Sequence, residues 1–206
     1  MNRTAPPSAS TTPVRLLAAF GWTFRYVPPP GPKAVVIFYP HTSNWDFPLG
    51  ILARWASRLP LFWVGKHTLF RPPFGALFRR LGGLPVNRKA SVGMVDQLRA
   101  HFESHPAFYL AIAPEGTRAR VDAWKTGFYQ IARAAKVPVG LGFIDYAHHE
   151  IGIEHWLELT GDSDADLARI AAAYEGRPGL HQEQAAPIRF RDSQKKLEGM
   201  STPDST

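Results

Sequence analysis

The chain has 206 residues, with 24 lysines and arginines against 17 aspartates and glutamates, and it contains no cysteine. This length suits one domain with a substantial core, and a hydrophobic fraction of 45% fits a folded globular protein. The lack of cysteine excludes disulfides, cysteine nucleophiles and thiolate metal sites. The net charge of +7 favours anionic partners, namely nucleic acid, acidic lipid or phosphorylated small molecules. No run of like charge indicates a nucleic-acid tail.

The first 27 residues differ in composition from the rest of the chain. Residues 1–13 are rich in serine, threonine and proline and lack the apolar core of a secretory signal, so we predict a disordered leader. Residues 14–27 are rich in leucine and aromatic side chains, and Gly21 interrupts them. They fit either a short interfacial helix lying on a bilayer or a first helix that packs on the domain or leads into the sheet. No stretch reaches the ~18 apolar residues of a membrane span.

Apolar runs alternate with amphipathic segments through the middle of the chain. The runs predict strands at residues 34–39, 61–65, 84–87, 108–112, 137–144 and 151–159. The amphipathic segments predict helices at residues 47–59, 73–81, 91–103, 126–136 and 163–174. This alternation predicts a single α/β domain whose central sheet is mostly parallel, with helices on both faces. We expect the domain to span residues 14–175, with a core at 33–160, and a polar C-terminal tail to span 176–206, in which Ile188 and Phe190 dock.

A histidine and a carboxylate lie on the short connection after the first predicted strand, which spans residues 34–39. His41 and Asp46 are separated by four residues, and a helix-like run begins at Asp46. In open α/β sheets, ligands bind outside the carboxyl ends of the strands. His41 at such a place is suited to take a proton from an attacking group, with Asp46 holding its other ring nitrogen. The alternative is a turn interaction in which Asp46 only caps its helix.

Basic and small polar residues come after other predicted strands: Lys66, Arg88, Gly116, Thr117 and Arg118. In a parallel sheet, the turns that carry them emerge at the same edge as His41. Arg88 and Arg118 can each present a guanidinium fork to phosphate oxygens, and Lys66 can add a point charge. A glycine at position 116 allows backbone N–H groups to approach an anion, and Thr117 offers a hydroxyl. Taken singly, each arginine fits an ordinary surface charge better than an anion site, and it is their common position after strands that favours the anion site.

Four blocks of this sequence resemble the bacterial 1-acyl-sn-glycerol-3-phosphate (lysophosphatidic acid) acyltransferases and the wider glycerophospholipid acyltransferase family. In chain order, the blocks are His41 to Asp46, Gly83 to Arg88, Pro114 to Arg118, and Val137 to Val139. The third block, Pro-Glu-Gly-Thr-Arg, matches the family pattern in full. The resemblance covers about residues 33 to 145 and implies a glycerol-3-phosphate acyltransferase-like fold.

The resemblance also implies an activity and roles for the residues in the blocks. His41 would act as general base on the acceptor hydroxyl, oriented by Asp46, and the hydroxyl would attack the thioester of acyl-CoA or acyl carrier protein directly. The acceptor phosphate would lie against residues of the second and third blocks: Arg88, Glu115, Gly116, Thr117 and Arg118. Because a carboxylate repels phosphate, we assign Glu115 to holding an arginine or the backbone in place. No metal ion or other cofactor is expected.

The resemblance and the basic charge together predict a role in phospholipid biosynthesis. The expected partners are the acyl thioester, a lysophospholipid or alcohol acceptor and an anionic membrane surface, without nucleic acid. We expect a cytoplasmic protein, peripheral on the inner face of the cell membrane. Two alternatives stay open. One is an O-acyltransferase acting on another lipid, such as an amino-acid lipid. The other is a non-catalytic basic module that binds anionic membrane or nucleic acid.

Two further patterns fit other kinds of site less well. Ser43 beside His41 does not make a serine hydrolase, because no Gly-x-Ser-x-Gly elbow occurs in the chain. His101 and His105 have the spacing of a helical metal pair but lack the acidic partner pattern of zinc proteases.

Overall fold

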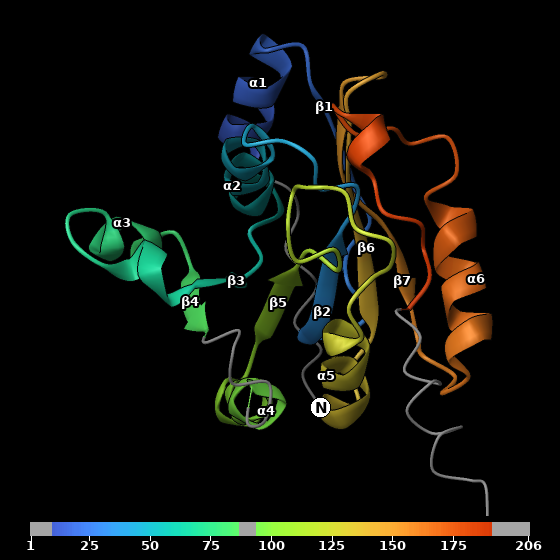
Figure 1. The fold of residues 1–206 in the computed structure, drawn as a ribbon. Coiled ribbons are helices and arrows are strands. Elements are labelled where there is room, and N and C mark those ends of the chain that lie inside the picture. The colour runs from blue at the N-terminus through green and yellow to red at the C-terminus, as the bar shows by residue number, and fades with distance from the viewer. Residues whose placement is uncertain (1–9, 87–93, 191–206) are drawn as a thin grey trace, which may run out of the picture.

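A seven-stranded sheet forms the centre of the protein in a computed structural model that describes residues 10–86 and 94–190 (Figure 1). Its strands lie in the order β1-β7-β6-β2-β5-β3-β4. Their bounds are Thr23–Tyr26 (β1), Lys33–Phe38 (β2), Leu61–Lys66 (β3), Gly83–Val86 (β4), Phe108–Ile112 (β5), Val139–Asp145 (β6) and Glu150–Leu157 (β7). All six strands predicted from the sequence are present; β5 has the predicted ends, and the other five differ slightly from the prediction.

Most of the sheet is parallel. β2 pairs in parallel with β5 and β6, and β3 pairs in parallel with β5 and β4. β7 runs antiparallel to β6, and β1 runs parallel to β7. Five strands, β2 to β6, therefore end at the same edge of the sheet. This confirms the predicted α/β class with a mostly parallel sheet, and it brings the turns after these strands to one edge.

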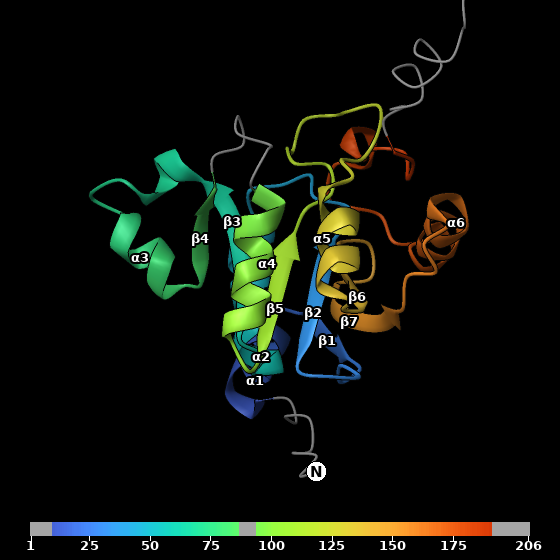
Figure 2. The same cartoon turned by 90° about the horizontal axis from the view of Figure 1, so that it is seen from below.

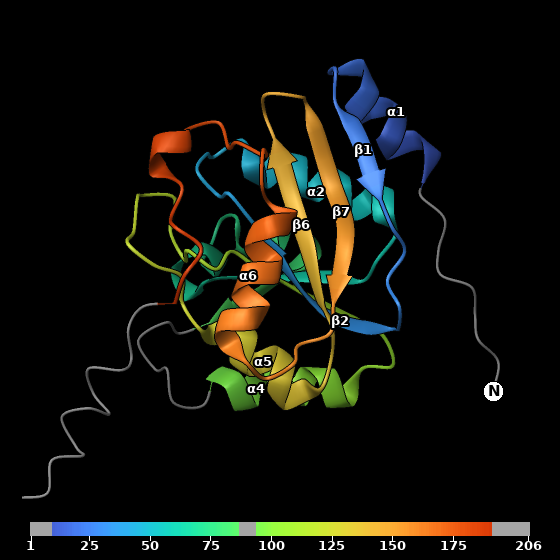
Figure 3. The same cartoon turned by 90° about the vertical axis from the view of Figure 1, so that its right-hand side faces the viewer.

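Helices cover both faces of the sheet (Figures 2 and 3). Their bounds are Thr11–Ala19 (α1), Asp46–Ser57 (α2), Gly75–Arg80 (α3), Met94–Ser104 (α4), Gly127–Ala135 (α5) and Ser163–Ala173 (α6), with short 3-10 helices at His67–Phe70 (η1) and Gln182–Gln184 (η2). α4, α5 and α6 pack on one face, and α1 and α2 pack on the other. No helix in the described ranges combines the length and the apolar character needed to cross a bilayer.

The strand β2 shows why its sequence is a continuous apolar run. Val35 and Ile37 contribute to the core under α4, α5 and α6, whereas Ala34 and Val36 face the opposite side of the sheet. All four side chains are fully buried. A strand covered on both faces has no exposed positions, so the alternating polar residues of a half-exposed strand are missing.

The prediction of one helix over residues 14–27 is wrong in its second half. Helix α1 already begins at Thr11, within the predicted leader, and the chain turns at Gly21, whose φ is 78°. Residues 23–26 then form β1 at the edge of the sheet, where exposed and partly buried side chains alternate. The side chain of Leu17 is fully buried and packs with Ala53 and Ala56 of α2. This part of the chain therefore packs on the domain and leads into the sheet.

One predicted helix is clearly shorter in the structure, and two predicted elements extend beyond the described residues. The helix predicted at 73–81 is the shorter α3, and η1 precedes it. The first residues of the helix predicted at 91–103 and the last residue of the strand predicted at 84–87 lie in the segment 87–93, outside the described residues.

The predicted polar tail is not loose between residues 176 and 190. The N–H of Trp124 donates a hydrogen bond of 2.7 Å to the carbonyl oxygen of Arg189, and Phe190 forms a β-bridge with Trp124. The ring of Phe190 packs against Tyr129 of α5, and Ala186 is fully buried. We call residues 177–190 the C-terminal segment. The predicted docking of Ile188 and Phe190 is confirmed, since both side chains pack against the core. The other contacts of the segment were not predicted, because backbone groups make many of them.

The close approach of β1 and β7 gives a test of the fold. Gly152 lies opposite Arg25, and a Cβ atom at this position would be 1.6 Å from the carbonyl oxygen of Arg25. We expect Gly152→Ala to lower the free energy of unfolding by about 1–3 kcal/mol, because the two strands must separate. In contrast, a methyl group at Gly50 in α2 meets nothing within 4 Å. Gly50→Ala should leave stability unchanged or raise it by up to about 1 kcal/mol. Urea denaturation of both variants measures this difference, and equal midpoints would contradict the strand pairing.

Candidate active site

Turns from four strands meet at the carboxyl edge of the sheet. The loop from His41 to Asp46 follows β2, the motif from Pro114 to Arg118 follows β5, and Tyr146 directly follows β6. Lys66 ends β3, two places from β2 in the sheet, and its side chain is exposed. No hydrogen bond or ion pair within the described part of the chain joins Lys66 to the His41 loop. Arg88 belongs to the segment 87–93 and lies outside the described residues.

His41 and Asp46 form a direct pair. The Nδ1 atom of His41 lies 3.0 Å from Oδ2 of Asp46, and the imidazole side chain is 23% exposed, against 3% for the carboxylate. With Nδ1 bound to the carboxylate, the ring proton is held at Nδ1, so Nε2 is left as the proton acceptor. Asp46 is the first residue of α2, but no side chain caps this helix. The alternative of a simple helix cap therefore does not describe this pair.

The carboxylate of Asp46 accepts two further hydrogen bonds. The N–H of Ser43 donates to Oδ2 at 2.9 Å, and the hydroxyl of Tyr146 donates to Oδ1 at 2.7 Å. Burial acts to raise the pKa of Asp46, but the donors at His41, Ser43 and Tyr146 outweigh it and hold this pKa below its usual range. Asp46 is therefore an anion at neutral pH, and it can stabilise an imidazolium that forms at His41.

Tyr146 is a part of the site that the sequence reasoning missed. Burial and the hydrogen bond to Asp46 raise the pKa of its hydroxyl well above the usual range, so the group stays protonated and donates. Its ring packs edge-on against Trp22, at a centroid distance of 5.1 Å. The residue could have been considered from its place directly after an apolar strand, which is the signal that drew attention to the other turns.

Glu115 is buried and binds backbone N–H groups. Its Oε2 accepts a hydrogen bond of 2.8 Å from the N–H of His41, and its Oε1 accepts one of 3.0 Å from the N–H of Ala186. Burial raises the pKa of Glu115, and these two donors oppose the rise because they favour the carboxylate. One carboxylate thus joins the His41 loop to the C-terminal segment.

The last residues of the same motif lie at the surface. Gly116 has a φ of 70°, and a Cβ atom there would lie 2.8 Å from Nζ of Lys125. The hydroxyl oxygen of Thr117 accepts from the N–H of Ala119 at 3.2 Å. Nε of Arg118 donates to the carbonyl oxygen of Ser43 at 3.0 Å. The remaining N–H groups of the guanidinium are oriented away from this bond and can bind an anion.

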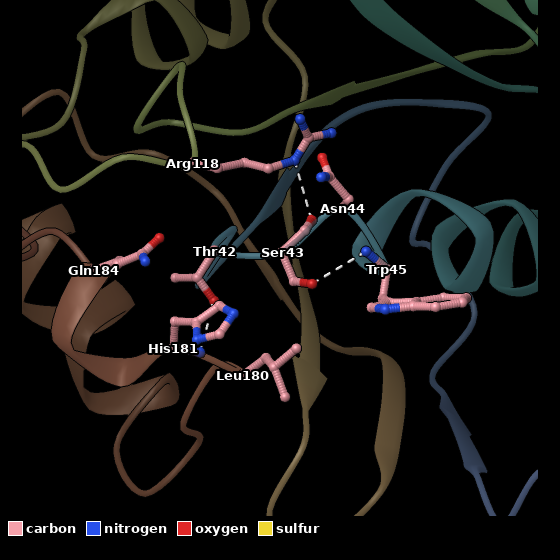
Figure 4. Close-up of a pocket in the computed structure, with 8 residues that line it drawn as sticks. All are labelled: Thr42, Ser43, Asn44, Trp45, Arg118, Leu180, His181 and Gln184. Carbon is pink, nitrogen blue, oxygen red and sulfur yellow. Dashed lines mark hydrogen bonds between the residues drawn. The ribbon is translucent and has the colours of Figure 1, made fainter.

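A cleft of about 410 Å³ opens beside the His41 loop (Figure 4). It is lined by Thr42, Ser43, Asn44, Trp45, Arg118, Leu180, His181 and Gln184. The first four residues directly follow His41, although His41 itself is not part of the lining. Of the other predicted site residues that the structure describes, only Arg118 reaches this cleft. Its lining combines one cation, several neutral polar groups and two apolar side chains, which suits a small anionic group attached to an apolar chain.

Comparisons with known proteins agree with this geometry. The sequence model of the family described as Acyltransferase matches residues 25–140, which is more than half of the chain. Comparison with curated protein sequences gives no match. Among solved structures, the fold is similar to that of the 1-acyl-sn-glycerophosphate (LPA) acyltransferase PlsC from Thermotoga maritima, with a TM-score of 0.54 and 16% sequence identity. The alignment covers 94% of this chain and 78% of that one. The family match, together with the paired His41 and Asp46 at the sheet edge, shows that this chain is an enzyme of the acyltransferase family.

Proposed function

We propose that the enzyme transfers a fatty acyl group from acyl-CoA or acyl carrier protein to the hydroxyl of a lysophospholipid, in phospholipid biosynthesis. The acceptor we propose is 1-acylglycerol-3-phosphate. The observation that carries the proposal is the contact between Nδ1 of His41 and the buried carboxylate of Asp46, which leaves Nε2 as a base. A basic module that only binds anionic membrane would have no use for this pair.

The proposed reaction is a direct acyl transfer. Nε2 of His41 takes the proton of the acceptor hydroxyl while the hydroxyl oxygen attacks the thioester carbonyl carbon. The tetrahedral intermediate then breaks its carbon–sulfur bond, the new ester forms, and the thiolate takes the proton from His41. A thioester already carries a good leaving group, so the step requires a base and the positioning of both substrates, and no metal ion or redox group.

Positive charge at the edge of the sheet supports a phosphorylated acceptor. The guanidinium of Arg118 lines the cleft and is held by Ser43, next to the His41–Asp46 pair. Arg88 and Lys66 remain proposed contributors to phosphate binding, Arg88 from the second sequence block and Lys66 from the end of β3. Gly116 and Thr117 would shape the turn that carries Arg118.

We also propose that the enzyme works on an anionic membrane surface, at the inner face of the cell membrane. The segment of η1 and α3 stands out from the edge of the sheet (Figure 1). Its large apolar side chains Leu69, Phe74 and Leu77 are 46%, 62% and 51% exposed. Exposed arginines lie among them: Arg71, Arg79 and Arg80. Apolar groups beside cations suit the interface of an acidic bilayer.

The role of His41 predicts a specific loss of activity. We expect His41→Ala to lower kcat about 10²–10⁴-fold, since the general base is removed. The control is His155→Ala, because His155 is exposed on β7. The assay follows thiol release from a long-chain acyl-CoA with 1-acylglycerol-3-phosphate. A loss smaller than about tenfold in His41→Ala would contradict the assigned base. Wild-type enzyme that releases no thiol with any lysophospholipid or alcohol acceptor would overturn the proposed function.

The role of Arg118 predicts discrimination by phosphate. Arg118→Ala should raise KM at least about tenfold for a phosphate-bearing acceptor, equivalent to about 1.4 kcal/mol, and much less for a phosphate-free acceptor. Arg99→Ala is a suitable control, because Arg99 is exposed on α4 and pairs with Glu103. Steady-state kinetics with both kinds of acceptor make the measurement. Equal effects on both would show that the acceptor is not recognised by its phosphate.

A further inference from the structure

The cleft beside the His41 loop has two walls from distant parts of the chain. One wall consists of residues 42–45 together with Arg118. The other consists of Leu180, His181 and Gln184, which belong to the C-terminal segment (Figure 4). The first wall lies within the part of the chain that matches the acyltransferase family, residues 25–140, and the second lies outside it. The part of the chain that matches the family therefore makes one wall of this cleft and not the other.

Hydrogen bonds fix the second wall to the catalytic motifs. The N–H of Ala186 donates to Glu115, and its carbonyl oxygen accepts from the hydroxyl of Tyr39 at 2.8 Å. The N–H of His181 donates to the hydroxyl oxygen of Thr42 at 3.2 Å. The guanidinium of Arg120 donates to the carbonyl oxygen of Glu183 at 3.1 Å. The segment is thus joined to the loop after β2 and to the loop after β5, and it presents its side chains at a defined place.

The segment is also fixed where it leaves α6. The guanidinium of Arg177 lies over the ring of Phe143, 3.6 Å from its centroid. The same group hydrogen-bonds to Glu154 and lies 3.8 Å from a carboxylate oxygen of Glu150. Both acidic residues belong to β7, so the start of the segment is bound to the sheet. A segment fixed at both ends and in the middle is suited to act as a wall of a binding site.

The side chains around the cleft match the parts of a monoacyl glycerophosphate. Arg118 supplies a cation for the phosphate, and the Gln184 amide and the His181 imidazole supply N–H donors for phosphate or glycerol oxygens. Trp45 and Leu180 are 69% and 42% exposed, and they offer an apolar border for the first methylene groups of the acyl chain.

We propose that the C-terminal segment forms the second wall of the acceptor site, with His181 and Gln184 selecting the polar head group. This assignment rests on the proposed function, since it places the acceptor of that reaction in the cleft. A thioester donor also carries phosphate groups, but one wall of the cleft consists mainly of the four residues that directly follow His41. The acceptor hydroxyl must reach this histidine, so the acceptor is the substrate we assign to the cleft.

Two substitutions in the wall test the assignment. Gln184→Glu keeps the shape of the side chain but adds a negative charge to the cleft that contains Arg118, and His181→Ala removes a donor. The control is Glu175→Gln just before the segment, because Glu175 is exposed and does not line the cleft. The acceptor KM is measured at saturating acyl-CoA, and the donor KM at saturating acceptor. Circular dichroism establishes that each variant is folded.

We expect Gln184→Glu to raise the KM for 1-acylglycerol-3-phosphate at least about tenfold, with the donor KM unchanged, because like charges repel in the cleft. His181→Ala should raise the acceptor KM by a smaller factor, and Glu175→Gln should change neither the acceptor KM nor the donor KM. A rise in the donor KM alone, or no change in either constant, would overturn the assignment.

Wild-type kinetics separate this proposal from the proposed function. If the wild-type enzyme turns over only a phosphate-free acceptor, the proposed acceptor is wrong. The wall is then tested by measuring the KM of His181→Ala for that phosphate-free acceptor. A raised KM for it leaves the wall assignment standing, and an unchanged KM overturns it. If no acceptor is turned over, calorimetric titration with a short-chain monoacyl glycerophosphate replaces the kinetics. Weaker binding to Gln184→Glu than to Glu175→Gln supports the wall, and equal binding or none overturns it.

Discussion

The buried carboxylate of Glu115 is the contact on which the arrangement of the site depends. It accepts hydrogen bonds from the backbone N–H of His41 and from that of Ala186, which are far apart along the chain. An unpaired buried carboxylate is costly, so both donors are needed at their places when this group is charged. One side chain therefore positions both the His41 loop and the segment that lines the cleft.

The motif that contains Glu115, Pro114 to Arg118, makes a second connection to the His41 loop. After Glu115 the chain turns at Gly116 and returns toward the loop, where Arg118 binds the carbonyl oxygen of Ser43. Within the Pro-Glu-Gly-Thr-Arg motif, Glu115 accepts a hydrogen bond from the backbone N–H of His41. Arg118 uses Nε for Ser43, so its other N–H groups can bind an anion. One short motif thus holds the His41 loop in place and also contributes a cation to the cleft.

The orientation of His41 depends on a second buried carboxylate with several partners. Asp46 receives hydrogen bonds from Ser43 and Tyr146 as well as from the imidazole, and these donors keep it ionised despite its burial. The three donors come from the loop after β2 and from the end of β6. Because the donors are in place before any substrate binds, little reorganisation is required when a positive charge forms at His41.

Much of this site could be predicted from the sequence because it depends on strand ends. Apolar runs identify parallel strands, and the turns after such strands share one edge, so the proximity of the His41 loop and the Arg118 motif can be inferred from the pattern alone. Tyr146 was missed because no motif distinguishes it. The docking of Ile188 and Phe190 was predicted from their apolar side chains, and both pack against the core. The contacts of Ala186 and Arg189 were missed, because backbone hydrogen bonds leave no pattern in side chains. β1 was mistaken for helix because four residues are too few to establish a period.

The role of Glu115 can be measured by amide hydrogen exchange in Glu115→Gln, with Glu158→Gln as control because Glu158 is exposed. Glutamine has only one acceptor oxygen, and its NH₂ group cannot accept from the second N–H, so at least one of the two contacts must break. We predict that the amides of His41 and Ala186 both exchange at least about tenfold faster than in the wild type, because the two segments share one anchor. Wild-type exchange rates at both amides in Glu115→Gln would contradict the role of Glu115 in holding the two segments.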